Sequence, residues 1–344
     1  MSASLRGKNV LVTGGTGFVG GHLLPLLVQA GAHVACLSRN ASAAARLPAG
    51  VAVFRADLGT GEGLERAFRE AGGPDVVIHM AALLFGLSWQ DYLRANASAA
   101  RSLFSVLDRA DPERVVLVSS LAAVGPCAHA PGRAEDVAPA PVSAYGWSKL
   151  LAEQILRPLG DRLVIVRPPI IYGSGDRGLL PVFRGALRGV AVSPGLGREF
   201  PVSALHAEDV ARAVLCVCAP QARGVYHLDD GRRHTMASFC QALGQALYEC
   251  AGRPAGGRVR VLRLPLPLMA VSAGICTAAA QLAARFVPLQ RAPNWNFDKY
   301  REARQEGWLS DASRIRRELG WEAGISLADG LREAARGYLR DGWL

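Results

Sequence analysis

The 344-residue sequence lacks the features by which several classes of protein are recognised. It shows no internal repeat of about 20–50 residues, which argues against a solenoid or a propeller. It has no Lys/Arg-rich run and no aromatic ladder, so its net charge of +10 predicts no nucleic-acid partner. No leader segment precedes the first apolar run, so we expect no signal peptide and a cytoplasmic protein.

The seven cysteines include no CxxC pair, a spacing typical of zinc and redox sites. The closest two, Cys216 and Cys218, lie in an apolar helical run over 210–219. Residues two apart on a helix point in different directions, which makes this pair a poor start for a metal site. We therefore predict core cysteines, reduced thiols and no bound metal.

Acidic residues are absent from 251–293, although this stretch contains six arginines. Within it, 264–284 is a run of 21 uncharged residues, which is long enough to span a membrane. Pro265, Pro267 and many small residues weaken that interpretation. Three alternatives stay open for 264–284: buried cap helices, an interfacial helix or a span. The interfacial alternative predicts a peripheral membrane contact through 253–291.

A glycine-rich segment follows the first apolar strand, predicted at 8–13. Residues 13–20 read TGGTGFVG and lead into an apolar helix. Glycines in this position serve a tight turn, close approach of a pyrophosphate, and close packing of helix on strand. The diphosphate of a dinucleotide then lies at the helix N-terminus. The cofactor-binding residues predicted in this loop are Gly14, Thr16, Gly17, Phe18, Val19 and Gly20.

The second strand, predicted at 33–37, ends without the acidic residue that binds the ribose 2′-hydroxyl in NAD enzymes. Ser38 and Arg39 occupy this place. A guanidinium favours a 2′-phosphate, whereas a carboxylate repels it. We therefore predict NADP(H) as the preferred cofactor. NAD(H), with Arg39 as a solvated loop residue, is the alternative.

Tyr145 and Lys149 are four residues apart in a predicted helix and share one of its faces. A nearby ammonium favours the phenolate and lowers the pKa of a tyrosine from about 10. Such a pair suits proton transfer at a hydroxyl or a carbonyl. Ser120 lies 25 residues earlier, at the end of a strand predicted at 114–118. Ligands bind at such strand ends, and Ser119 is the alternative hydroxyl.

Taken in chain order, these motifs resemble the extended short-chain dehydrogenase/reductase family, the NAD-dependent epimerase/dehydratase superfamily. Their style is closest to the 3β-hydroxysteroid dehydrogenase and dihydroflavonol reductase branches. The segments that carry the resemblance are TGGTGFVG at 13–20, HMAA at 79–82, SSLAAVGP at 119–126 and RPPIIYGSGD at 167–176.

The resemblance implies an α/β fold, a Rossmann doubly wound parallel sheet with a smaller, discontinuous, mostly helical substrate lobe. The expected NAD(P)-binding domain spans 1–173 with about 205–231, and the lobe spans 174–204 and 232–344. Family members are often dimers through the helix that holds the Tyr–Lys pair, so a homodimer is a further expectation.

The resemblance also assigns roles to individual residues. Tyr145 is the expected general acid/base, and Lys149 lowers its pKa and holds the nicotinamide ribose. Ser120 fixes the substrate oxygen. Besides Tyr145 and Lys149, the further cofactor contacts it implies are Asp57, Leu58, Met80, Ala81, Ala82, Asn96, Pro168 and Ile170.

The predicted function is NAD(P)-dependent hydride transfer at a secondary alcohol or ketone of a hydrophobic, sterol-, lipid- or polyketide-like substrate. The apolar, basic stretch 253–291 favours such a substrate over a sugar nucleotide. A nucleotide-sugar epimerase or dehydratase is the alternative, although Leu121 and Ala122 supply no acid pair for dehydration. A non-catalytic NAD(P)-binding protein is the second alternative, disfavoured because Tyr145 and Lys149 are both present.

Overall fold

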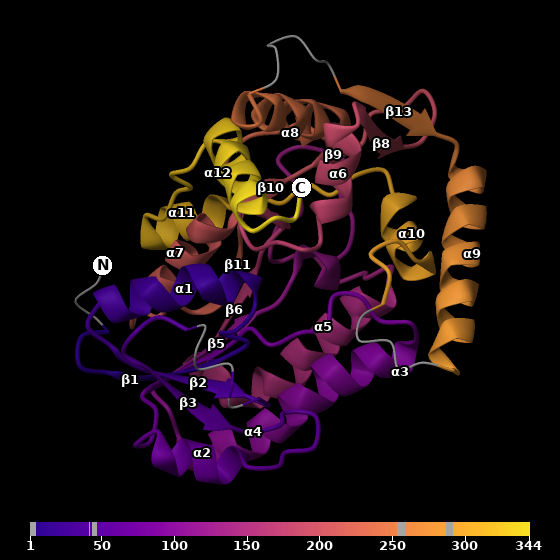
Figure 1. The fold of residues 1–344 in the computed structure, drawn as a ribbon. Helices are drawn as coiled ribbons and strands as arrows, with labels where there is room; N and C mark the ends of the chain where they lie inside the picture. The colour runs from indigo at the N-terminus through magenta and orange to yellow at the C-terminus, as the bar shows by residue number, and fades with distance from the viewer. Residues whose placement is uncertain (1–4, 41, 43–46, 253–258, 287–291) are drawn as a thin grey trace.

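A computed structural model describes residues 5–40, 42, 47–252, 259–286 and 292–344, so 253–258 and 287–291 of the basic stretch lie outside the described residues. A seven-stranded parallel sheet organises the fold, in the order β11-β6-β5-β4-β1-β2-β3 (Figure 1). Its strands are β1 Asn9–Thr13, β2 His33–Ser38, β3 Val51–Arg55, β4 Val76–His79, β5 Arg114–Val118, β6 Leu163–Arg167 and β11 Gly224–His227.

Helices cover both faces of this sheet. One face carries α1 (Phe18–Gln29) and α7 (Ala207–Val217), and the other carries α2 (Leu64–Glu70), α4 (Ala99–Ala110) and α5 (Ala144–Leu156). The chain order reverses between β1 and β4, and ligands bind at the carboxyl ends of strands beside such a reversal. The predicted fold is therefore confirmed, and it directs attention to the loops after β1, β4 and β5.

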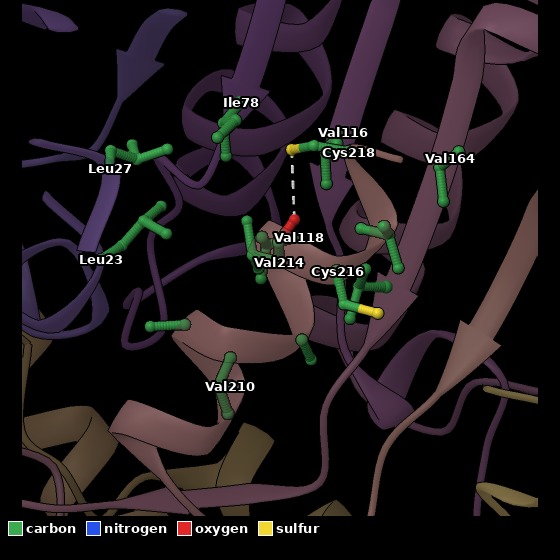
Figure 2. Close-up of a cluster of buried hydrophobic side chains, with 14 of the residues drawn as sticks. Leu23, Leu27, Ile78, Val116, Val118, Val164, Val210, Val214, Cys216 and Cys218 are labelled. Atoms are coloured by element: carbon green, nitrogen blue, oxygen red, sulfur yellow. Dashed lines mark hydrogen bonds between the residues drawn. The ribbon is translucent and has the colours of Figure 1, made fainter. Parts of the chain in front are cut away.

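The core on the α1–α7 face is made of aliphatic side chains from the sheet and both helices. Figure 2 shows Leu23 and Leu27 of α1 close to Val210 and Val214 of α7. Cys218 belongs to the same core, where its thiol donates to the Val214 carbonyl oxygen at 3.2 Å. Burial raises the pKa of this thiol to about 12, which fits the predicted packing role and not a metal-binding one.

The C-terminal half adds a second cluster around helices α6 (Leu180–Leu187), α8 (Met236–Cys250) and α12 (Leu327–Arg340). Short strand pairs form separate two-stranded sheets beside the main sheet. The pairs are β10 (Ala204–His206) with β7 (Ile170–Tyr172), β12 (His234–Thr235) with β9 (Pro201–Val202), and β13 (Arg260–Leu264) with β8 (Val190–Pro194).

The remaining elements are helices at the periphery and near the catalytic segments. They are α3 (Trp89–Tyr92), the π-helical turn η3 (Leu93–Ser98), the 3-10 turns η4 (Leu121–Ala123) and η5 (Arg157–Arg162), α9 (Leu266–Ala284), α10 (Phe297–Ala303) and α11 (Ser313–Leu319). The segment before α11 is hydrogen-bonded to the loop after β5. Leu309 N donates to Cys127 O at 2.8 Å, and Arg133 N donates to Leu309 O at 2.9 Å.

Helix α9 contradicts the buried-cap alternative. It stands along the outer edge of the molecule, with α10 between it and the sheet domain (Figure 1). Only 17% of its 18-residue apolar window is buried. With 19 residues and a mean hydropathy of 1.6, the helix is long and apolar enough to cross a bilayer. Composition alone did not reveal the orientation, because the inward residues of α9 are mostly small and apolar too.

Candidate active site

The glycine loop after β1 is held against the loop after β4. Gly14 has φ +76°, and a Cβ at this position would lie 2.6 Å from Ala81 N. A Cβ on Gly20 would lie 2.2 Å from Gly15 O, so α1 packs tightly on the loop. Gly17, the N-cap of α1, offers no side-chain hydrogen bond. The first amides of a 12-residue helix therefore remain for another acceptor, which fits a cofactor diphosphate.

His79 fastens the ends of β1 and β4 to each other. Its Nδ1 lies 2.6 Å from Thr13 Oγ1, which also accepts a hydrogen bond from Ala81 N at 3.3 Å. Burial lowers the pKa of His79 to about 3, and Lys149 acts in the same direction. His79 is therefore neutral at physiological pH, and its role is to position residues 80–82 beside the glycine loop.

Asn96 connects three segments around the predicted cofactor site. It lies in η3 and is 2% exposed. Its amide oxygen accepts from Leu83 N at 2.8 Å, and its amide nitrogen donates to Ser148 Oγ at 2.8 Å. Ser148 belongs to α5, so Asn96 fixes α5 to the loop after β4.

The remaining predicted cofactor contacts lie at the carboxyl edge of the sheet. Ser38 ends β2 and exchanges hydrogen bonds with the Asn40 backbone, while Arg39 beside it is exposed. Asp57 Oδ1 accepts from Gly59 N at 2.7 Å in the turn after β3, next to the half-buried Leu58. Pro168 and Ile170 follow β6, and Pro168 O accepts from Leu121 N at 2.9 Å.

The two serines after β5 have different partners. Ser119 Oγ donates to Glu153 Oε1 at 2.5 Å. Glu153 is in turn bound by the Arg167 guanidinium, with NH2 to Oε2 at 2.6 Å, and both side chains are 5% exposed. Ser120 instead lies near the Tyr145 phenol and lowers its pKa, and the Ser120 Oγ accepts from Ala122 N at 3.2 Å. This geometry favours Ser120 over Ser119 as the hydroxyl that meets a substrate.

Tyr145 and Lys149 lie in the first two turns of α5 and are 8% and 2% exposed. Lys149 Nζ donates to Val118 O at 2.9 Å, at the end of β5. Burial lowers the pKa of Lys149 to about 8, although Glu153 opposes this change. Burial raises the pKa of Tyr145, and the Lys299 ammonium and the nearby Ser120 act against that rise.

Sequence reasoning missed two groups that support these residues. The buried Glu153–Arg167 pair is one, and its signal was available as the four-residue spacing from Lys149 to Glu153 on one helix face. The other is helix α10, which supplies Asp298, Lys299 and Glu302 from 153 or more residues away. No local pattern near Tyr145 points to so distant a segment.

A doubly wound sheet with a glycine loop at β1 and a Ser–Tyr–Lys set after β5 defines a class of dinucleotide-dependent enzymes. The profile of the NAD dependent epimerase/dehydratase family matches residues 10–228. The chain therefore belongs to this family, the extended short-chain dehydrogenases/reductases, as the motifs predicted. It is an NAD(P)-dependent enzyme of that type.

Two relatives and one solved structure show the range of the similarity. The ceramide reductase of Caulobacter vibrioides is 31% identical over 354 residues, covering 100% of this chain and 98% of the relative. A UDP-glucose 4-epimerase of Azospirillum brasilense is 29% identical over 349 residues, which cover 96% of this chain and 92% of the relative. A solved epimerase structure from Methanothermobacter thermautotrophicus matches with a TM-score of 0.75 at 22% identity, over 99% of this chain and 95% of that protein. At this identity, the match shows a shared fold alone.

Proposed function

We propose that this chain interconverts a ketone and a secondary alcohol on a hydrophobic substrate, with NADP(H) as the preferred cofactor. The observation that carries this proposal is the Ser120–Tyr145 hydroxyl pair at the carboxyl end of β5, in which Tyr145 is buried, Ser120 is half-buried, and the buried Lys149 follows one turn along α5. Two adjacent hydroxyls can hold one carbonyl oxygen, and a phenol can give or take its proton. When bound, the nicotinamide supplies or accepts the hydride.

In the reducing direction, Ser120 donates a hydrogen bond to the carbonyl oxygen and Tyr145 donates its proton as negative charge develops there. The ammonium of Lys149 stabilises the phenolate that remains. In the oxidising direction the phenolate takes the proton of the alcohol. Burial of Tyr145 and Lys149 excludes water from these steps.

The preference for NADP(H) rests on Ser38 and Arg39 at the end of β2. A charge-assisted contact of Arg39 with the 2′-phosphate is worth about 1.5–3 kcal/mol, or roughly ten- to hundredfold in affinity. We expect Arg39→Ala to weaken NADPH binding by about this factor in fluorescence titration and to leave NADH binding unchanged. Arg317→Ala, at an exposed position on α11, is the matched control. Equal binding of NADPH and NADH by the parent protein would overturn the preference.

The hydrophobic substrate is supported by the similarity to a ceramide reductase over 100% of this chain. It is also supported by the turn after Ser120, where Leu121 and Ala122 are buried and uncharged. We expect NADPH oxidation with a long-chain N-acyl amino ketone of the 3-oxoceramide type or with a sterol 3-ketone, each in detergent micelles. Conversion of UDP-glucose to UDP-galactose instead would establish the epimerase alternative. Tight NADPH binding without turnover of either kind would indicate a non-catalytic protein.

A peripheral membrane contact belongs to the same proposal, because α9 exposes large aliphatic side chains. Those at 268, 271, 275 and 282 are 55–65% exposed. Two of its polar side chains are used on the opposite side, toward α10: Ser272 Oγ accepts from Trp295 Nε1 at 3.2 Å, and Thr277 Oγ1 accepts from Phe297 N at 2.8 Å. Exposed Arg260, Arg263 and Arg285 flank this surface, which suits anionic lipid headgroups.

Flotation with vesicles tests this contact. We expect the protein to float with vesicles that contain about a third phosphatidylglycerol, and less with pure phosphatidylcholine. Val271→Asp with Ile275→Asp removes flotation, while Val137→Asp, at an exposed apolar position in a loop, retains it. If the parent protein stays with the unbound fraction, the contact is refuted. Self-association that the α9 variants abolish would assign the surface to a second copy of the chain.

A cytoplasmic location and a homodimer complete the proposal. All seven cysteines are unpaired, which suits a reducing compartment. Trp147 projects from α5 with 45% of its surface exposed, a feature that suits a helix-to-helix contact with a second copy. We expect light scattering to give the mass of a dimer and Trp147→Asp to give that of a monomer.

A further inference from the structure

Helix α10 of the substrate lobe lies against the N-terminus of the catalytic helix α5. Asp298 Oδ1 accepts from Ala144 N at 2.6 Å, and Asp298 Oδ2 accepts from Tyr145 N at 3.2 Å. Glu302 Oε1 accepts from Ser143 Oγ at 2.7 Å. Two carboxylates from α10 thus bind the first turn of α5, so the position of α10 relative to Tyr145 is fixed.

Between these carboxylates, Lys299 turns toward the catalytic tyrosine. Its Nζ lies 4.5 Å from the centre of the Tyr145 ring and 5.5 Å from that of Phe85. Glu302 Oε2 accepts from the same nitrogen at 2.9 Å, and both side chains are 18% exposed. An ammonium this close to an aromatic face, with little water around it, acts strongly on the charge of that ring.

We propose that Lys299 is a positioning residue for the proton step, whose ammonium, held by Glu302 against the Tyr145 ring, favours the ionised phenol. The inference rests on the proposed function, because it assigns a second cation to the same proton transfer. Lys149 remains the lysine of the Tyr–Lys motif. Lys299 enters from the substrate lobe and adds a charge that the motif does not contain.

The charges around Tyr145 agree with this role. Burial alone would lower the pKa of Lys299, but Glu302, Tyr145 and Asp298 together raise it, so Lys299 stays an ammonium at neutral pH. Lys299 is the strongest influence opposing the rise that burial causes in the pKa of Tyr145, whereas Glu302 adds to the rise. Among the described residues, the polar and titratable groups near Tyr145 include Ser120 after β5, Tyr92 on α3, and Asp298, Lys299 and Glu302 on α10. Lys149 follows one turn along α5.

The pH dependence of alcohol oxidation tests the role of Lys299, using the alcohol of whichever micellar ketone the parent enzyme reduces. Phenolate is the base in this direction, so kcat/KM rises with pH until Tyr145 is ionised. Because Lys299→Met removes the ammonium, we expect the rise of kcat/KM (the ascending limb) to occur about one to two pH units higher in this variant. At neutral pH the variant is then about ten- to hundredfold slower, and at high pH it regains the parental rate. Lys299→Arg keeps the charge and returns the limb to the parental pH.

A uniform loss at every pH with an unmoved limb would refute the role, because that is the signature of structural damage alone. Lys299→Gln, with its shorter polar chain, repeats the test if the Met variant folds poorly. A second readout needs no substrate: tyrosinate absorbance near 295 nm after a rapid pH jump, taken as the difference between each protein and its Tyr145→Phe form. We expect the same upward shift in Lys299→Met. An unshifted absorbance titration overturns the inference even if no ketone is turned over.

Discussion

At the scale of single residues, we expect loss of the Tyr145 hydroxyl to impair turnover but not cofactor binding. Tyr145→Phe keeps the ring that Lys299 faces and removes only the proton donor. We expect turnover of the micellar ketone to fall by about 10²–10⁴, the usual contribution of a general acid or base. NADPH binding, measured by fluorescence, remains within about threefold of the parent, because the glycine loop is untouched. Unchanged turnover would remove Tyr145 from the proton step.

Gly14 makes an equally local prediction about the cofactor. Gly14→Ala forces a Cβ within 2.6 Å of Ala81 N at a φ of +76°, so the loops after β1 and β4 must separate. We expect loss of NADPH binding and a lower melting temperature. Gly21→Ala is the matched control, because Gly21 lies in α1 with open space around it. That substitution stabilises the helix by about 1 kcal/mol.

The sequence predicted these residues because cofactor chemistry demands particular residue types at fixed distances along the chain. Gly14, Ser120, Tyr145 and Lys149 all belong to short segments that end a strand or begin a helix. Lys299 belongs to no such segment, since its role arises only when two helices far apart in sequence meet. The catalytic roles of Ser120, Tyr145 and Lys149 stay predictions until the variants are measured.

At the scale of elements, Ser143 caps α5 by accepting from Gly146 N at 3.0 Å, and α10 supplies acceptors for two further amides of the first turn. Asp298→Ala removes the acceptor for Ala144 N and Tyr145 N. We expect a loss of about 1–2 kcal/mol in the free energy of unfolding in urea, the range measured for helix caps. Asp298→Asn retains one acceptor and loses less. Equal stability of the Ala variant and the parent would show that the first turn of α5 needs no partner from α10.

Elements differ in how far the sequence reveals them. The strands of the sheet were predictable as short buried apolar runs followed by motifs, and the structure places β1, β2 and β5 where expected. Helix α9 was predictable as a helix but not in its orientation, because its inner positions such as Ala273 and Ala280 are as apolar as its outer ones. The division into two domains stays a prediction.

At the scale of the whole molecule, two buried histidines predict sensitivity to acid. Burial lowers the pKa of His79 to about 3 and that of His227 to about 4, while the unfolded chain titrates near 6.5. Between about pH 6.5 and 4 the folded state therefore binds fewer protons than the unfolded state. Stability is present above this window and falls through it by about 1.4 kcal/mol per pH unit for each histidine.

Urea unfolding at pH 6.5, 5.75 and 5.0 measures this slope. His227→Asn should reduce the slope of the free energy of unfolding against pH by up to about 1.4 kcal/mol per pH unit. His33→Asn, at an exposed position in β2, should leave it unchanged. The same slope in all three proteins would mean that other groups cause the acid sensitivity.

The contacts of α10 and of the tail set an order in which the site can be completed during synthesis. Every cofactor motif lies before residue 177, yet carboxylates that bind the first turn of α5 come from 298–302, and hydrogen bonds to the loop after β5 come from 307–311. A nascent chain that has not passed residue 298 holds Tyr145 and Lys149 without those carboxylates. The surroundings of Tyr145 are therefore complete only once residue 311 has been synthesised, whatever the first half has already folded.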